Sequence, residues 1–289
     1  MNRKHAAGRW LASPLALFML LFFVVPTLLL FVYSFWRAHT FQLEVDLTLT
    51  NYLKALTTAI FYSVTWTGLK IGFITATIST AVSYPVAYYL VFRTRGNIVL
   101  YLVLVSWFMS YLVRVFAWRT ILGSNGIVNS GLQALGLIDE PLSFLLFSPF
   151  AVVVTLVHIL LPFTLLLLVS ALRDVKVEYL EAARDLGAGL GAIFFRVLLP
   201  LTLNGVIGAF MFTFVLAAGD YVTPQLVGGR QGITTGVLVA NQFKLTGNWP
   251  YGASMAFLLL ALFLFVYFLV IQLTKVARLA PGSRFHDAA

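Results

Sequence analysis

The sequence contains no cysteine and very little charge. Its 289 residues include no Cys, and only 10% are Asp, Glu, Lys or Arg. The absence of cysteine excludes a disulfide framework and thiolate chemistry. Soluble domains are about 25% charged and about 45–50% apolar, whereas this chain is 61% hydrophobic. The composition therefore predicts an integral membrane protein, and the net charge of +9 does not indicate a nucleic-acid partner.

Nucleotide-binding and catalytic motifs are also missing from the sequence. None of the six lysines, at positions 4, 54, 70, 176, 244 and 275, is followed by Ser or Thr. This excludes the P-loop pattern G-x-x-x-x-G-K-[ST], whose backbone N–H groups hold phosphates. The sequence also has no HExxH, GxSxG or Cys/His pair. We expect no catalytic residue, no cofactor and no metal site in this chain, and we interpret the lone His158 as a packing residue.

Six long apolar runs predict six membrane-spanning helices, because each meets the requirement of about 20 residues per crossing. The first run is longer than a secretory signal and lacks its small-residue cleavage site, so we expect it to stay in the membrane. The fifth is expected to start at Pro200, whose missing N–H costs little in the first helical turn. The runs cover residues 11–35, 62–92, 98–122, 149–172, 201–222 and 251–274.

The distribution of Lys and Arg predicts the orientation of these spans. Six crossings place both termini on one side of the membrane. That side carries twelve basic residues and the opposite loops carry four. Because cytoplasmic loops are enriched in Lys and Arg, we expect both termini and the loop between the fourth and fifth spans to be cytoplasmic. The twelve are Arg3, Lys4, Arg9, Arg93, Arg95, Arg173, Lys176, Arg184, Arg196, Lys275, Arg278 and Arg284, and the four are Arg37, Lys54, Arg230 and Lys244.

The loop between the fourth and fifth spans is a polar segment in an otherwise apolar chain. It reads EYLEAARDLGAGLGAIFFRVLLP over residues 178–200. Tyr179, Ala183 and Leu186 recur at i, i+4 and i+7, which predicts a short amphipathic helix with these three residues against the bundle. Gly187 can end this helix, because glycine readily adopts positive φ. The helix is expected to lie along the membrane surface with its charged face in the cytosol.

This loop also carries a family motif. Glu181-Ala182-Ala183, then Gly187 and, after nine further residues, Val197-Leu198-Leu199-Pro200 resemble the EAA motif of ABC importer permeases, with Val197 in place of Ile. The resemblance implies the type I ABC importer permease fold and a coupling loop that docks on a separate ATP-binding subunit. An ordinary interfacial helix with a chance EAA is the alternative. The residues expected to form the coupling loop are Glu178, Tyr179, Glu181, Ala182, Ala183, Arg184, Gly187 and Pro200.

The resemblance to ABC importer permeases also implies the partners and the domain organisation. The partners would be ATP-binding subunits that hold ATP and Mg²⁺, a second permease subunit (a copy or a different chain), and an extracytoplasmic solute-binding protein. All would work at a bacterial inner membrane, by alternating access. The permease core would be residues 63–274. An N-terminal segment, 1–62, would hold the first span and a periplasmic loop, and 275–289 would be a cytoplasmic tail.

Asp220 is the candidate residue for substrate recognition. The stretch 219–229, GDYVTPQLVGG, is similar to the corresponding stretch of spermidine/putrescine permease subunits. Polyamines are cationic, so a carboxylate suits their pathway, and we expect Asp220 and Tyr221 to line it. The alternatives are that Asp220 caps the next short helix or pairs with Arg114 or Arg119. An opine, a phosphonate, sulfate or ferric iron is the alternative solute, and a gradient-driven carrier or channel is the alternative class.

Three basic residues fall inside the predicted spans, namely Lys70, Arg114 and Arg119. Charges in hydrocarbon are expensive. We therefore expect these side chains to extend to the outer interface or to pair with acids.

Overall fold

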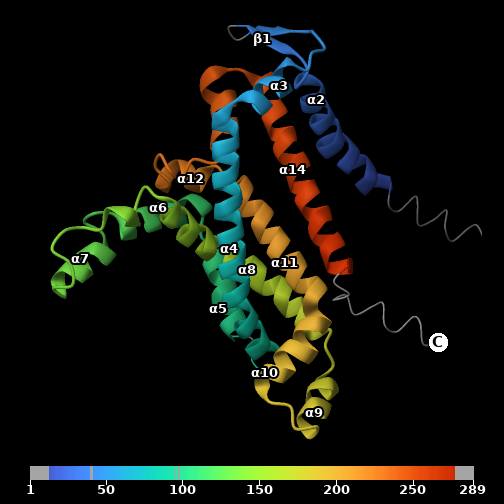
Figure 1. Ribbon diagram of the computed structural model, residues 1–289, viewed down its shortest axis with the longest axis vertical. Coiled ribbons are helices and arrows are strands. Elements are labelled where there is room, and N and C mark those ends of the chain that lie inside the picture. The colour runs from blue at the N-terminus through green and yellow to red at the C-terminus, as the bar shows by residue number, and fades with distance from the viewer. Residues whose placement is uncertain (1–12, 40–41, 95, 97, 277–289) are drawn as a thin grey trace, which may run out of the picture. The chain divides into compact units, whose positions relative to one another are not determined.

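The computed structural model describes residues 13–39, 42–94, 96 and 98–276, and most of them are helical (Figure 1). Within these residues, five helices are long and apolar enough to cross a membrane, and a bent pair of helices can supply a sixth span. The predicted all-α membrane fold is therefore confirmed. The five are Ser13–Tyr33, Ala59–Phe92, Pro149–Arg173, Leu190–Gly219 and Trp249–Lys275.

Some predictions fall on parts of the chain outside the described residues. They include the first two residues of the first span, the end of the tail from 277, and half of the basic residues assigned to the cytoplasm. These basic residues are Arg3, Lys4, Arg9, Arg95, Arg278 and Arg284. The orientation and the domain boundaries therefore stay predictions.

The described residues divide into two units by their contacts. The first contains the residues up to Tyr62 together with Leu238–Ala261, and the second contains Ser63–Val237 and the residues that follow Ala261. The first unit holds the π-helix η1 (Leu20–Val24), α2 (Val25–Tyr33), the strands β1 (Arg37–His39) and β2 (Gln42–Glu44), α3 (Thr50–Thr57), the π-helix η4 (Gln242–Thr246) and the start of α14 (Trp249–Val276).

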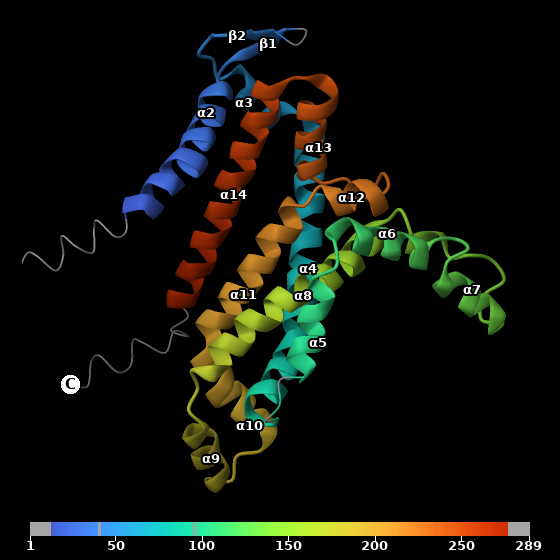
Figure 2. The ribbon, with the colours of Figure 1, turned by 180° about the vertical axis from the view of Figure 1, so that it is seen from behind.

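A hairpin and a short helix follow the first span in the first unit. Strands β1 and β2 pair antiparallel, with Arg37 opposite Glu44, and are seen beside α3 in Figure 2. An ion pair of 2.9 Å joins Arg37 Nε to Asp46 Oδ2. The amide of Asn51 on α3 donates to the carbonyls of Ser34 and Trp36. These bonds hold α3 against the end of α2.

The second unit contains the helices that carry the candidate sites. α8 and α11 lie side by side in it, and α4 packs against them (Figures 1 and 2). Its elements are α4 (Ala59–Phe92, from Ser63), α5 (Ile98–Trp107), α6 (Tyr111–Leu122), α7 (Ile127–Ala134), the 3-10 helix η2 (Ser143–Leu145), α8 (Pro149–Arg173), α9 (Val177–Asp185), α10 (Leu190–Ile193), the π-helix η3 (Phe194–Leu198), α11 (Leu199–Gly219), α12 (Val222–Val227), the start of α13 (Thr235–Asn241, up to Val237) and α14 from Leu262.

Small and hydroxylated residues bring α8 and α11 together. A Cβ built at Gly205 of α11 would collide with Cβ of Ala171 on α8. The buried hydroxyls of Thr164 and Thr213 join the same helices with a 2.7 Å hydrogen bond. Lipid chains are as apolar as Leu, so helices in a membrane associate through such close packing and interhelical bonds. Gly205 is therefore a position where only a missing side chain allows the two backbones to approach.

The third span differs from the straight helix expected over residues 98–122. α5 ends at Trp107, and the stretch Tyr111–Ala134 leaves it at an angle of 92°. Residues 108–110 form the break, and Ser110 is extended with φ −53° and ψ 139°. α5 has ten residues and is therefore about 15 Å long, too short to cross a bilayer alone. The expectation of a single helix over residues 98–122 was wrong. The sequence did not indicate the break, because residues 108–110 contain neither Gly nor Pro.

The fifth span begins earlier than the expected residue 201. The helix runs from Leu190 to Gly219 as one span of 30 residues. Pro200 is tolerated inside it because the preceding turn, η3, is a π-helix in which the Leu199 amide bonds to the Phe194 carbonyl. A proline in a helix interior clashes with the carbonyl four residues before it, and a wider turn relieves that clash. The same arrangement recurs where η1 precedes Pro26.

Candidate functional site

The polar segment between the fourth and fifth spans folds as the helix α9. Its buried anchor is Leu180, which is only 2% exposed, with the half-buried Ala183 beside it. Tyr179 is 49% exposed and Leu186 is 88% exposed. The expectation that Tyr179 and Leu186 face the bundle was therefore wrong. α9 is only nine residues long, and its inward face follows the i, i+3 pair of Leu180 and Ala183.

Gly187 ends α9 as the sequence predicts. Its φ is +79°, a left-handed conformation that glycine adopts without strain. The Gly187 amide bonds to the Arg184 carbonyl at 2.8 Å, and the Ala188 amide to the Ala183 carbonyl at 3.0 Å. These two bonds form a Schellman motif, which satisfies carbonyls that the helix end would leave unpaired. The chain then turns directly into α10.

The outward face of α9 presents both charge and apolar surface. Glu178, Glu181 and Arg184 are exposed, and none forms an ion pair with another described side chain. Ala182 and Leu186 are exposed on the same short element. A helix anchored by one buried leucine, with unpaired charges and a protruding leucine on its other side, offers the chemistry of a docking surface. Exposed apolar residues rimmed by charge are typical of protein–protein contacts.

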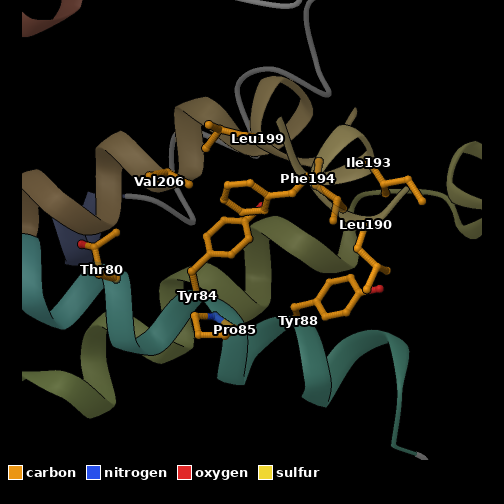
Figure 3. Close-up of a pocket in the computed structure, with 11 residues that line it drawn as sticks. Thr80, Tyr84, Pro85, Tyr88, Leu190, Ile193, Phe194, Leu199 and Val206 are labelled. Carbon is orange, nitrogen blue, oxygen red and sulfur yellow. The ribbon is translucent and has the colours of Figure 1, made fainter. Parts of the chain in front are cut away.

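A cavity lies where the segment after α9 meets α4. It measures about 590 Å³ and its lining is mostly apolar. Figure 3 shows Tyr84 and Tyr88 of α4 on one side and Leu190, Ile193 and Phe194 on the other. The Tyr84 and Phe194 rings meet edge to face, with centroids 5.2 Å apart.

Contacts around this cavity tie α9 to the spans. The Tyr84 hydroxyl forms a buried hydrogen bond of 2.9 Å with Thr202 of α11. Leu180 of α9 belongs to the same buried cluster as Tyr84, Leu172 of α8 and Leu198. Packed side chains and this hydrogen bond therefore connect α9 with α4, α8 and α11.

Asp220 lies where α11 ends and α12 begins. Its Oδ2 accepts the backbone amide of Thr223 at 2.9 Å, in the first turn of α12. Its own carbonyl accepts the hydroxyl of Thr234 at 3.0 Å. The Tyr111 hydroxyl shares a 2.7 Å hydrogen bond with the hydroxyl of Thr223. It also lies close to the Asp220 carboxylate. The hydrogen bond from the Thr223 amide is the contact expected if Asp220 caps the next short helix. That Asp220 and Tyr221 line the solute pathway stays a prediction.

The two arginines considered as partners of Asp220 contact other groups. Arg114 is 5% exposed and its Nη1 makes a long contact of 3.5 Å with the Ile159 carbonyl. Arg119 lies over the Phe147 ring at 5.7 Å. Neither forms an ion pair with a described carboxylate. The alternative in which Asp220 pairs with Arg114 or Arg119 is therefore not seen.

His158 is hydrogen-bonded, as expected, but it is exposed and is not a buried packing residue. Its Nδ1 accepts a 2.9 Å hydrogen bond from the indole N–H of Trp118. In the part of the chain that the structure describes, no three His, Cys, Asp or Glu side chains are placed to hold a metal ion.

Several residues of these sites were missed in the sequence. Leu180 was passed over because a neighbouring i, i+4, i+7 set fitted the helical period better. Leu180 lies three residues before Ala183, and this i, i+3 spacing was the signal that could have placed it on the inward face. Tyr111, Thr223 and Tyr84 carried no signal, because each forms its hydrogen bond with a residue more than a hundred positions away in the chain.

The long apolar helices define a multi-span membrane protein, and the exposed face of α9 is its candidate docking surface. The chain matches the family of binding-protein-dependent transport system inner membrane components over residues 5–276. It belongs to this family and is therefore an inner-membrane transport component.

The chain is similar to two curated relatives of the same description. It is 33% identical over 256 residues to the spermidine/putrescine transport system permease protein PotB of Haemophilus influenzae, covering 86% of this chain and 89% of the relative. It is 31% identical to PotB of Escherichia coli strain K12, covering 86% and 92%.

A solved structure shows the same fold at low sequence identity. The chain superposes on a subunit of a bacterial ABC transporter involved in the import of the acidic polysaccharide alginate, with a TM-score of 0.75 at 13% identity. The match covers 94% of this chain and 97% of the other. The type I importer permease fold expected from the EAA motif is confirmed.

Proposed function

We propose that this chain is the permease subunit of an ABC importer that moves polyamines such as spermidine and putrescine across the inner membrane. The relatives named spermidine/putrescine permeases, which the chain matches at 31–33% identity over most of its length, support the solute. Membership of a binding-protein-dependent family argues against the gradient-driven carrier or channel. An importer for an opine, a phosphonate, sulfate or ferric iron is the competing assignment.

The partners follow from the exposed face of α9. We infer that Glu178, Glu181, Ala182, Arg184 and Leu186 dock into a groove on a separate ATP-binding subunit, which holds ATP and Mg²⁺. The observation that carries this proposal is that these residues are exposed while Leu180 fixes the helix to the spans. A second permease subunit and an extracytoplasmic solute-binding protein complete the assembly.

The proposed mechanism is alternating access driven by the partner's ATP hydrolysis. ATP closes the nucleotide-binding subunits and moves α9. The contacts of Leu180, Tyr84 and Thr202 carry this motion into α4, α8 and α11. The spans then open outward to accept solute, and hydrolysis returns them to the inward-facing state. Asp220 and Tyr221 line the pathway, where a carboxylate attracts a cationic solute.

Reconstitution of the full importer tests both the solute and the docking. The chain is assembled with its ATP-binding and second permease subunits in proteoliposomes, and radiolabelled spermidine uptake is measured with the binding protein present. Glu181→Lys reverses a charge at the docking surface, so uptake should fall by about tenfold or more, as expected for loss of a contact worth about 1.4 kcal/mol or more. The ATP-binding subunit should also co-purify less.

Glu140→Lys is the matched control, because Glu140 is also exposed but lies in the loop before α8. Association with the ATP-binding subunit should be unchanged in this variant. Equal association in the two variants would contradict the docking role. Uptake of sulfate or an opine in place of spermidine by the unaltered assembly would contradict the proposed solute and leave the docking untouched.

A further inference from the structure

An apolar groove beside a membrane-embedded lysine is left unexplained by the proposed transport cycle. The groove measures about 370 Å³ and is walled by α4, α11 and α14, and all of its lining residues belong to the second unit. Its lining is almost entirely apolar. The residues that form it include Trp66, Phe73, Phe210, Phe214, Val266 and Val270.

Lys70 supplies the charge at this groove. Its aliphatic stem lines the wall, and its Nζ lies 6.0 Å from the centroid of the Trp66 ring. Lys70 is exposed and forms no ion pair with another described side chain. A lysine in this setting keeps its stem on apolar surface and its ammonium group at the polar boundary.

The length of α4 sets the depth of Lys70 in the bilayer. The helix has 34 residues and is therefore about 51 Å long, whereas the hydrocarbon core is about 30 Å thick. The exposed Arg93, which follows the last helical residue, fixes that end at one interface. Lys70 lies about 33 Å from Phe92 along the helix, so it lies at the opposite interface. Trp66 beside it is typical of the aromatic belt at that depth.

We propose that this groove binds an anionic phospholipid of the leaflet opposite Arg93. The headgroup phosphate pairs with the Lys70 ammonium group, and one acyl chain lies along the groove toward Ile74 and Val270. An anionic lipid is favoured over a zwitterionic one because an unpaired ammonium group attracts net negative charge. This inference goes beyond the proposed transport function and needs only that the chain is embedded in the membrane.

Photo-crosslinking tests the site directly. The assembled importer is placed in phosphatidylcholine nanodiscs that contain phosphatidylglycerol with a diazirine in its acyl chain, and labelled peptides are identified by mass spectrometry. We expect labelling at Phe73, Ile74 and Phe210. Lys70→Gln should reduce this labelling by about fivefold, the attraction of one basic residue near a membrane surface, and Lys70→Arg should restore it.

Lys54→Gln is the matched control, because Lys54 also lies over an aromatic ring, 4.8 Å from the Tyr251 centroid, but outside the groove. Labelling of the groove should be unchanged in this variant. A second variant, Ile74→Trp, fills the groove without changing its charge and should also abolish the labelling.

Three results would overturn the proposal. One is equal labelling of the groove in the Lys70→Gln and unaltered assemblies. Another is equal labelling by a diazirine phosphatidylcholine. The third is a carbodiimide cross-link from Lys70 to a carboxylate of the second permease subunit, which would make the groove a subunit contact. None of these results depends on uptake, so failure of the polyamine assignment leaves the lipid site testable.

Discussion

At the scale of single residues, Asp220 combines two features that mutation can separate. Its carboxylate accepts the Thr223 amide in the first turn of α12, and it also carries a negative charge beside Tyr111. An asparagine at this position keeps an oxygen acceptor for the amide but removes the charge. An alanine removes both.

The two substitutions therefore give different predictions. Asp220→Asn should keep the fold and lower spermidine uptake by up to about tenfold, if about 1.4 kcal/mol of attraction is lost. Asp220→Ala should in addition lose about 1 kcal/mol of stability, the typical value of a lost helix cap. Uptake kinetics and the thermal midpoint of the purified assembly measure the two effects. Normal uptake by Asp220→Asn would show that Asp220 only caps α12.

At the scale of elements, the long apolar runs predicted most spans but not how they bend. The runs ending at Tyr33, Phe92 and Arg173 were placed to within a few residues, because about 20 consecutive apolar residues are an unambiguous signal. The break at residues 108–110 and the π-helix before Pro200 had no such signal. An apolar run reports the length of a span and not where its backbone bends.

The candidate site shows the same division between local and distant information. The exposed charges of α9 and the positive φ of Gly187 could be predicted, since a turn and a charged segment are local properties. The inward face of α9 could not be assigned, because the choice between Leu180 and Leu186 depends on where Leu172 and Tyr84 lie.

The packing of α8 against α11 gives a prediction with an internal control. Gly205→Ala places a methyl group against Ala171 and should destabilise the assembly by about 1–3 kcal/mol, the usual range for overpacking. Gly208→Ala lies on the same helix with no atom within 4 Å of the added Cβ, so it should be neutral or slightly stabilising. Thermal midpoints in detergent provide the measurement. Equal midpoints for the two variants would contradict the close approach of α8 and α11.

At the scale of the whole molecule, one fold occurs in transporters named for solutes of opposite charge. The chain shares its fold with a subunit of an importer of an acidic polysaccharide at 13% identity, yet its relatives at 31–33% identity are named for cationic polyamines. The shared helices therefore do not determine the charge of the solute. The fold alone therefore does not identify the solute, which has to be assigned from particular side chains.

The orientation of the chain is open to a direct test, because the sequence contains no cysteine. Leu186→Cys and Leu47→Cys place single thiols at positions that are 88% and 79% exposed. In spheroplasts, a membrane-impermeant maleimide should label Leu47→Cys at once and Leu186→Cys only after permeabilisation. Labelling of Leu186→Cys in intact spheroplasts would reverse the proposed orientation and remove α9 from the reach of cytosolic ATP-binding subunits.

The uninterrupted helix from Leu190 to Gly219 has a thermodynamic consequence. One of its ends adjoins α9 and the other adjoins Asp220, so it joins the proposed docking surface to the proposed solute pathway. Linkage requires that any influence between the two be mutual. If nucleotide-driven docking alters the affinity for solute by some factor, then bound solute must alter the affinity of docking by the same factor.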